Sequence, residues 1–261
     1  MNKVEVAEFP ELKHKYYESV TKYPTINAVI SNVQNGYVYS NADRNNLFVC
    51  AKFGWSLLLA EDATEISTLF DFLKANREIP DYIHLLPPNK ALIKYIEGNW
   101  PKFKIRERCQ LRYLKNLQTF DYKKILPYGF SIVKIQDIEF SKLDVFKFDL
   151  DKRYWQSKDD FIKNAIGVCL VNPNNEFIAI CYSICIADDI AEVEIFVFPE
   201  YQGKGFGRIV AESFLNLTIE KGVIAHWDTF TANTPSLALA QKLGFQKIQD
   251  YDLVSTFLRN W

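Results

Sequence analysis

The stretch E-I-F-V-F-P-E-Y-Q-G-K-G-F-G-R, from Glu194 to Arg208, decides how the rest of the chain is interpreted. An apolar strand pattern ends at Pro199, and glycines then recur at the alternate positions 203, 205 and 207. A helical pattern of apolar residues begins at once. Glycines allow positive φ and close backbone approach, and the N–H groups at a helix start attract anions. The segment therefore predicts a loop that binds a phosphate or pyrophosphate.

Three kinds of phosphate-binding loop compete for this pattern. A P-loop needs G-x-x-x-x-G-K-[ST], which the sequence does not contain. A dinucleotide-binding loop needs G-x-G-x-x-G and an acidic residue about 20 positions later. Asp228 could be that acid, but Arg208 replaces the third glycine, and too little chain follows Gly207 for a doubly wound sheet. The coenzyme A loop of GNAT N-acetyltransferases, [QR]-x-x-G-x-[GA], is matched in full from Gln202 to Gly207.

The C-terminal half, about residues 128–261, resembles the GNAT (GCN5-related) N-acetyltransferase superfamily in its expected element order as well as in this loop. The segment from Asn233 to Ser236, followed by Lys242 to Phe245, is similar to the N-x-x-[AS] and K-x-G-F pattern of the family. Trp227-Asp228 ahead of it is similar to a GNAT subgroup that includes zwittermicin-resistance-type acetyltransferases. The resemblance implies a GNAT acyltransferase fold with acetyl-CoA as co-substrate.

We expect an α+β (mixed α/β) fold in two domains, because Pro127 and Gly129 punctuate the chain near its middle. Residues 1–127 would form an N-terminal α+β domain that contributes to the acceptor site and could be a degenerate relative of the second half. Residues 128–261 would form the acetyltransferase domain. Helices are expected over 10–20, 64–76, 90–99, 137–149, 158–165, from the glycine loop to 221 and from 235 to 244; strands are expected over 27–41, 47–61, 82–86, 106–114, 130–135, 167–171, 176–187, 190–198, 225–231 and 245–257.

The resemblance also implies where the co-substrate lies. The strands at 190–198 and 225–231 would separate, with pantetheine in the gap and the Val197 N–H on the thioester carbonyl. Asn233 and Ser236 would hold the cofactor arm, although both residue types also suit helix capping. The expected cofactor-binding residues are Phe196, Val197, Gln202, Gly203, Lys204, Gly205, Phe206, Gly207, Arg208, Asn233 and Ser236.

Glu194 is the candidate general base, because an acceptor amine is mostly protonated near neutral pH and must lose a proton before it attacks. Glu192 lies on the same face of an alternating strand and is the second candidate. A solvated or salt-bridged role for Glu194 stays open, and His226 is a further candidate base with a structural alternative. Many GNAT proteins place a Tyr general acid where this chain has Ala240, so the general acid stays unidentified. No metal is expected.

The composition argues against a nucleic-acid-binding, membrane-spanning or secreted protein. Lys and Arg number 31 against 32 Asp and Glu, so the chain does not have the basic excess of a general nucleic-acid binder. The longest apolar run, Phe177 to Ala187, is shorter than the ~20 residues of a membrane-spanning helix, and the first residues contain no signal-peptide core. The five cysteines form no C-x-x-C and are expected to be reduced core residues. These features favour a cytoplasmic monomer or homodimer.

The leading functional hypothesis is an N-acetyltransferase that transfers the acetyl group of acetyl-CoA to a primary amine of a small molecule, by direct attack in a ternary complex. A CoA-binding sensor or pseudoenzyme is an alternative, since a fold does not fix a function. Acetylation of a protein N-terminus or lysine is the third hypothesis. The sequence does not identify the acceptor.

Overall fold

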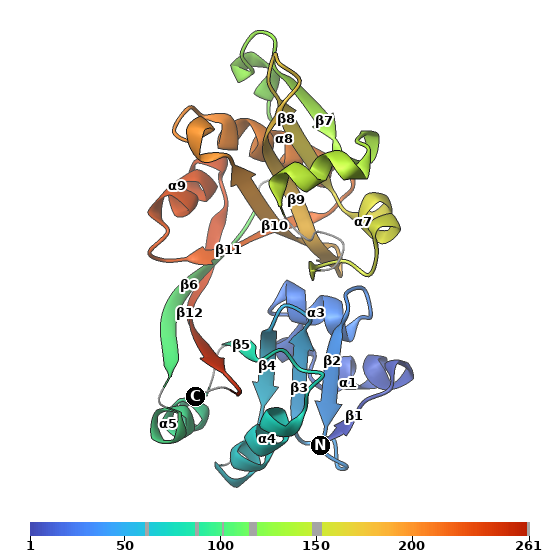
Figure 1. The fold of residues 1–261 in the computed structure, drawn as a ribbon, viewed down its shortest axis with the longest axis vertical. Helices are drawn as coiled ribbons and strands as arrows, with labels where there is room; N and C mark the ends of the chain where they lie inside the picture. Colours follow the sequence, from blue (N-terminus) through green and yellow to red (C-terminus); the bar gives the residue numbers. More distant parts are fainter. Residues whose placement is uncertain (61–62, 87–88, 101, 115–118, 148–152, 260–261) are drawn as a thin grey trace. The chain divides into compact units, whose positions relative to one another are not determined.

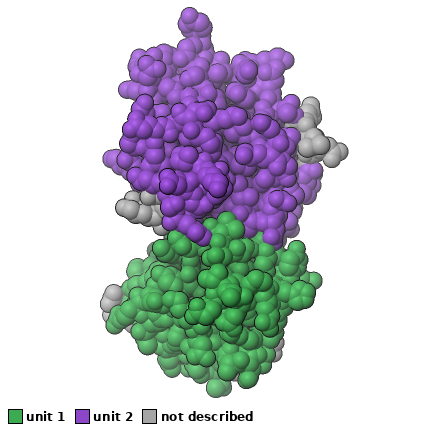
Figure 2. Space-filling model, turned by 90° about the vertical axis from the view of Figure 1, so that its right-hand side faces the viewer, with its two compact units in different colours: residues 1–108, 250–261 green, residues 109–249 purple. Residues whose placement is uncertain are grey.

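The computed structural model describes residues 1–60, 63–86, 89–100, 102–114, 119–147 and 153–259. The chain forms two compact units, which Figure 2 colours separately. Unit 1 comprises Met1–Arg108 with Asp250–Trp261, and unit 2 comprises Cys109–Gln249. The expected seam at residues 126–129 lies inside unit 2, and the division into domains 1–127 and 128–261 stays a prediction. None of the described helices is both long and apolar enough to cross a membrane.

Unit 2 contains a mixed sheet with the strand order β11-β10-β9-β8-β7 (Figure 1). Neighbouring strands are antiparallel except for β10 and β11, which are parallel. Its elements are β7 (Ser131–Lys134), α7 (Lys158–Asn164), β8 (Gly167–Val171), β9 (Phe177–Ala187), β10 (Ile190–Val197), α8 (Phe206–Glu220), β11 (Ile224–Phe230), α9 (Thr234–Leu243) and β12 (Gln246–Phe257), which leaves the unit after Gln249. This mixed α+β architecture confirms the predicted fold class.

The side chains of β10 alternate between two faces of the sheet, one packed in the core and one directed away from it. Val193, Ile195 and Val197 pack in the core beneath α8, together with apolar residues of α8 such as Val210 and Phe214. Since side chains of a strand alternate between its faces, Glu192, Glu194 and Phe196 project from the opposite face. All five cysteines lie in the described part of the chain, and each is buried with a free thiol. This agrees with the expectation that they are reduced residues of the core.

The strands of unit 1 follow one another in the order β1-β2-β3-β4-β5-β12. Strands β4 and β5 are parallel, and the other neighbours are antiparallel. Its elements are β1 (Asn2–Lys3), α1 (Phe9–Lys15), α2 (Tyr17–Val20), α3 (Pro24–Ile30), β2 (Gly36–Ser40), β3 (Leu47–Ala51), β4 (Trp55–Leu59), α4 (Ala63–Ala75), β5 (Tyr82–Leu86), α5 (Lys90–Asn99) and the first part of β6 (Phe103–Arg112).

Three expected elements differ from the structure. Residues 27–30 belong to α3 rather than to a strand, because Pro24 occupies its first turn and starts a buried helix. The strand expected over 47–61 is replaced by the two strands β3 and β4, and residue 61 lies outside the described residues. Gly54 has φ +94° in the turn between them, and a Cβ there would overlap the Tyr82 carbonyl oxygen. The helix expected over 137–149 is replaced by the 3-10 helices Ile135–Asp137 and Phe140–Phe146, and residues 148–149 lie outside the described residues.

The two units repeat one element order and exchange their last strands. Each has a first strand, short helices, a three-strand antiparallel meander, a helix, a strand parallel to the last meander strand, and a further helix. The strand after α5, β6, continues into unit 2, where Tyr113 donates its backbone N–H to Ala225 of β11. The strand after α9, β12, continues into unit 1 and pairs with β5. Unit 1 thus has the element order expected of a degenerate relative of unit 2.

The exchanged strand makes the core of unit 1 dependent on residues after position 250. Leu258 is fully buried among residues of α4, β5 and α5, whereas its neighbour Phe257 is 43% exposed. We expect Leu258→Ala to lower the free energy of unfolding of unit 1 by about 2–5 kcal/mol, because it leaves a cavity. Phe257→Ala, the matched control, should cost less than Leu258→Ala, because Phe257 is 43% exposed and loses mainly its contact with the Tyr82 ring. Denaturant unfolding curves of both variants test this, and equal effects would contradict the strand exchange.

Candidate active site

Strands β10 and β11 pair over three residues and then part. Their register runs Ile190 to Ile224, Ala191 to Ala225 and Glu192 to His226, and no later residues of the two strands are partners. On its other side β10 stays paired with β9 up to Val197. The register of that pair shifts between Glu192 and Val193, where β9 has an extra residue. A bulge bends the strand that carries it, so β9 bends at the point where β10, which stays paired with it, leaves β11.

The parting exposes backbone groups along one edge of β10. Phe198 donates its N–H to the Ile178 carbonyl on the β9 side, at 3.1 Å. Since successive residues of a strand direct their N–H groups to opposite neighbours, the N–H groups of Ile195 and Val197 point toward the gap. The Val197 carbonyl also belongs to this edge, and it accepts a hydrogen bond from Gln202 Nε2 at 3.0 Å. An extended chain in the gap could therefore form backbone hydrogen bonds with this edge of β10.

The glycine loop ends at the start of α8. Gly203 and Gly205 have φ values of +74° and +84°, and a Cβ on either would meet no atom within 4 Å. Gly205 is the residue just before α8, and it occupies the left-handed region that glycine tolerates. Within the described residues, the N–H groups of residues 203–207 have no protein acceptor. An open loop with free N–H groups at a helix start fits a diphosphate.

The charged residues of the loop have separate roles. Lys204 Nζ lies 5.5 Å from the centre of the Tyr201 ring, a cation–π distance. Arg208 Nε donates to the buried carboxylate of Glu212 at 2.6 Å, and the Arg208 side chain remains 57% exposed. Phe206 is buried beneath α8 and stacks on Phe130, with ring centres 5.2 Å apart. Lys204 and Arg208 are thus the two cations beside the loop, and Phe206 anchors it.

Asn233 and Ser236 lie at the start of α9, as the sequence predicts. The Asn233 side chain accepts the Ser236 N–H at 3.4 Å and caps the helix. Ser236 Oγ accepts from the Trp227 indole at 3.0 Å. Each residue therefore has a structural contact, and their contact with a cofactor stays a prediction. Ala240, where the Tyr of many GNAT proteins would stand, is fully buried in the core of unit 2.

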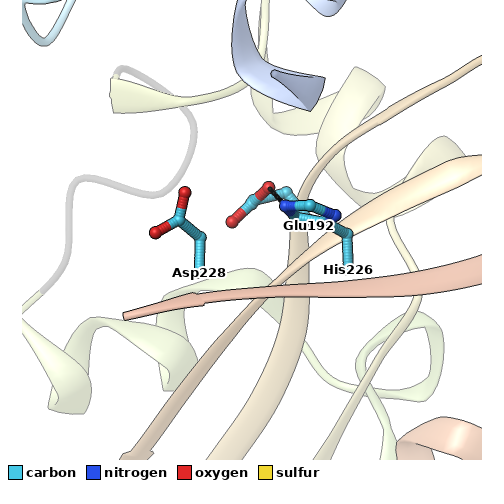
Figure 3. Close-up of side chains that lie close together, drawn as sticks. All are labelled: Glu192, His226 and Asp228. Carbon is cyan, nitrogen blue, oxygen red and sulfur yellow. Dashed lines mark ion pairs between the residues drawn. The ribbon is translucent and has the colours of Figure 1, made fainter. Parts of the chain in front are cut away.

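A polar cluster lies where β10 and β11 part. Figure 3 shows Glu192 of β10 with His226 and Asp228 of β11 projecting from one side of the strands. Their carboxylate oxygens and imidazole nitrogen lie within 4.8 Å of one another. His226 Nε2 is 3.7 Å from Glu192 Oε2, and Asp228 Oδ2 accepts from the buried Gln110 side chain at 3.4 Å. Two carboxylates thus flank the opening of the gap.

The protonation state of His226 follows from Arg112 of β6. Arg112 Nε donates to His226 Nδ1 at 3.3 Å, so Nδ1 holds the lone pair and Nε2 carries the hydrogen. Burial, followed by the charge of Arg112, lowers the pKa of His226 from 6.5 to about 3. A neutral imidazole with so low a pKa is a poor proton acceptor. The structure therefore disfavours His226 as the general base.

The same hydrogen bond decides whether the cluster fits a metal ion. Glu192, His226 and Asp228 are residue types that bind metals, and their spacing would allow it. However, a histidine binds a metal through an unprotonated nitrogen, and Nε2, which faces the carboxylates, carries the hydrogen. Arg112 would have to leave Nδ1 before Nε2 could coordinate. The residues present fit a metal poorly.

Glu194 lies one step further along the same face of β10. It is opposite Tyr182 in the pair with β9. Tyr154 is buried nearby: burial raises the pKa of its phenol, and the charges of Glu194 and then Glu192 raise it further. Both carboxylates therefore act on the same phenol, in agreement with the prediction that they share a face. Their roles as bases stay predictions.

Sequence reasoning missed Asp228 and Arg112 as members of this cluster. Asp228 could have been found, because it follows His226 by two residues on one strand and so shares its face. Arg112 could not, because it comes from β6, and the sequence gives no sign that a strand from the first half would lie beside β11.

The parallel strands β10 and β11, which part beside a glycine-rich helix start, form the arrangement that the resemblance to acyl-CoA-dependent acyltransferases implies. The sequence model described as GNAT acetyltransferase matches residues 15–254. The chain therefore belongs to the GNAT acetyltransferase family. The resemblance predicted for the C-terminal half is confirmed, and the match also includes most of the N-terminal half, from residue 15 onward.

Individual relatives agree with this assignment. The chain is 30% identical over 138 residues to the uncharacterized N-acetyltransferase YdfB of Bacillus subtilis (strain 168), a match that covers 52% of each protein, so the chain spans about half the length of that curated relative. A GCN5-related N-acetyltransferase-like protein from Streptococcus suis 89/1591 has a similar structure, with a TM-score of 0.75 and 17% identity over 94% of this chain and 98% of that one. A tandem GNAT protein from the clavulanic acid biosynthesis pathway also has a similar structure, with a TM-score of 0.62 and 10% identity over 98% of this chain and 95% of that one.

The low pKa of His226 predicts a pH dependence of stability. The unfolded chain binds a proton at His226 below pH 6.5, whereas the folded chain binds it only near pH 3. Stability should therefore fall as the pH drops through this window, by up to about 1.4 kcal/mol per pH unit. His226→Gln removes the effect, so wild type should lose stability relative to this variant from about pH 6 to about pH 4 in denaturant unfolding. The exposed-histidine variant His14→Gln is the control; parallel curves for wild type and His226→Gln would contradict a buried neutral imidazole.

Proposed function

We propose that this protein transfers the acetyl group of acetyl-CoA to a primary amine of a small molecule, in a ternary complex formed on unit 2. The observation that carries the proposal is the parting of β10 and β11 directly beside the open glycine loop. Acetyl-CoA would supply an acyl group activated as a thioester. The family assignment supports acyl transfer, and the acceptor class and mechanism are part of the proposal.

The residues of the loop would hold the diphosphate. Residues Gln202 to Arg208 offer backbone N–H groups, the positive end of the α8 dipole and the side chains of Lys204 and Arg208. Pantetheine would pair with the free edge of β10, where the Val197 N–H would donate to the thioester carbonyl. Phe196, on the other face of β10, forms an aromatic group with Phe146 and Phe198, with ring centres 6.2 Å and 5.1 Å from its own. This group would border the acetyl site.

The co-substrate would bind to unit 2 alone. In unit 1 the sequence between β4 and α4 reads Ala60-Glu61-Asp62, of which residues 61 and 62 lie outside the described residues. Those residues include no glycine, and two are acidic, which suits a diphosphate poorly. We therefore expect one acetyl-CoA per chain.

Glu194 would remove a proton from the acceptor amine, directly or through water, with Glu192 as the second candidate. Glu194 is half-buried on the face of β10 that points away from α8. The α8 face of β10 is filled by the core, so an acceptor would approach from the face that bears Glu194. His226 cannot share the task at neutral pH, since burial holds its pKa at about 3.

Binding of acetyl-CoA is tested by calorimetry on Gly205→Glu. The new side chain would place a negative charge at the diphosphate site and a non-glycine residue at φ +84°, so we expect binding to be lost. Gly222→Glu is a matched control, because Gly222 also has positive φ, at +68°, and open space around its Cβ at the other end of α8. Unchanged affinity in Gly205→Glu would remove the basis of the proposed function.

The role of Glu194 is tested by steady-state kinetics on Glu194→Gln. We expect turnover near neutral pH to fall by about 10²–10⁴-fold, since this is the usual effect of losing a general base. The loss should shrink at high pH, where the amine is already neutral, and acetyl-CoA affinity should be kept. Glu220→Gln, which neutralises an exposed carboxylate at the far end of α8, is the control. Wild-type turnover in Glu194→Gln would show that this residue is structural.

A further inference from the structure

The cluster of Glu192, His226 and Asp228 goes beyond what the proposed acetyl transfer requires. Two carboxylates lie within 4.8 Å of each other and of an imidazole nitrogen, and Glu192 is 7% exposed. Like charges this close repel each other, and burial weakens the screening by water. An ammonium group between two carboxylates at this spacing would be attracted to both.

His226 gives an independent indication of a ligand. Its side chain is fully buried, and among the described residues its Nε2 has no hydrogen-bond partner. Arg112 fixes the hydrogen on this nitrogen, and Figure 3 shows the imidazole directed toward Glu192. A cation between the carboxylates would reduce their repulsion and let Glu192 close the 3.7 Å separation to Nε2. The orphaned donor would then gain its acceptor.

The chemistry of the cluster selects the kind of cation. Nε2 carries a hydrogen, so it offers no lone pair to a metal ion. An ammonium group needs only acceptors, and the two carboxylates supply them from two strands. The cluster also lies at the opening of the gap, at the last paired residues of β10 and β11.

We propose that Glu192 and Asp228 bind the ammonium form of the acceptor, that His226 positions Glu192, and that the site selects amines with no carboxylate next to the nitrogen. This inference rests on the proposed acetyl transfer and specifies its acceptor class. A carboxylate on the carbon beside the amine would lie close to Glu192 and Asp228 and be repelled. Asp228 is thus a specificity-determining residue, and the preferred acceptors are alkylamines and diamines rather than amino acids.

The acceptor class is tested with pairs of molecules that differ only in the carboxylate: tyramine and tyrosine, agmatine and arginine, putrescine and ornithine. For wild type we expect the amine of at least one pair to have a kcat/KM at least about tenfold above that of its amino acid. Asp228→Asn should reduce that ratio, and the control Glu220→Gln should keep it. Circular dichroism and acetyl-CoA affinity establish that the variants are folded.

Each outcome decides between the hypotheses. Equal or better use of the amino acids, or an unchanged ratio in Asp228→Asn, would overturn the inference. So would a wild-type chain that binds acetyl-CoA but acetylates no amine of the panel. A chain that does not bind acetyl-CoA would overturn the proposed function itself, so the two failures are distinguishable.

The positioning role of His226 has its own test. His226→Leu removes the N–H donor, whereas His226→Gln keeps one. We expect His226→Leu to lower kcat with little change in the KM for acetyl-CoA, and His226→Gln to recover part of the loss. Nitrogen-15 NMR of the wild-type imidazole should show hydrogen on Nε2 and none on Nδ1. Hydrogen on Nδ1, or equal turnover in the two variants, would overturn this role.

Discussion

The bulge in β9, at the point where β10 leaves β11, is the constraint on which the rest of unit 2 depends. Without the extra residue in β9, β10 would continue beside β11 and its N–H groups would be used within the sheet. With it, Glu192 and His226 become the last paired residues, and the edge beyond them faces a gap. The glycine loop and the start of α8 follow directly from the free end of this strand. The bulge therefore marks the place where the glycine loop, the free edge of β10 and the polar cluster come close together.

Much of this arrangement could be predicted from local sequence. The glycine spacing after an apolar strand predicts the loop, and Gly203 and Gly205 adopt the positive φ that such a loop needs. The meander strands and the last two helices of unit 2 lie within a few residues of their expected bounds, because each has a clear period and a turn residue beyond its end. That residue is Pro or Gly except after β9, where Asp188 and Asp189 adopt positive φ. In unit 1, by contrast, residues 27–30 are apolar and β-branched enough to suggest a strand, and burial in a helix overrides that propensity.

What could not be predicted depends on contacts distant in sequence. Arg112 determines which nitrogen of His226 carries the hydrogen, yet the two residues are 114 positions apart and come from different halves of the chain. His226 looks like a candidate base in the sequence because histidine usually titrates near neutral pH, and only its burial and Arg112 reveal that it stays neutral. Periodicity assigns residues to strands but does not determine which strands become neighbours, so the cluster emerges only in three dimensions.

The exchange of β6 and β12 has a consequence for biosynthesis. His84 of β5 and Ser255 of β12 form a hydrogen bond across 171 positions, so the strands of unit 1 are not all in place until β12 has left the ribosome. During that interval β5 is an open strand edge, which can pair with other nascent chains. Contacts so distant in sequence also slow folding, because the long intervening loop must close first. Unit 1, although synthesised first, is therefore the part that would rely most on chaperones.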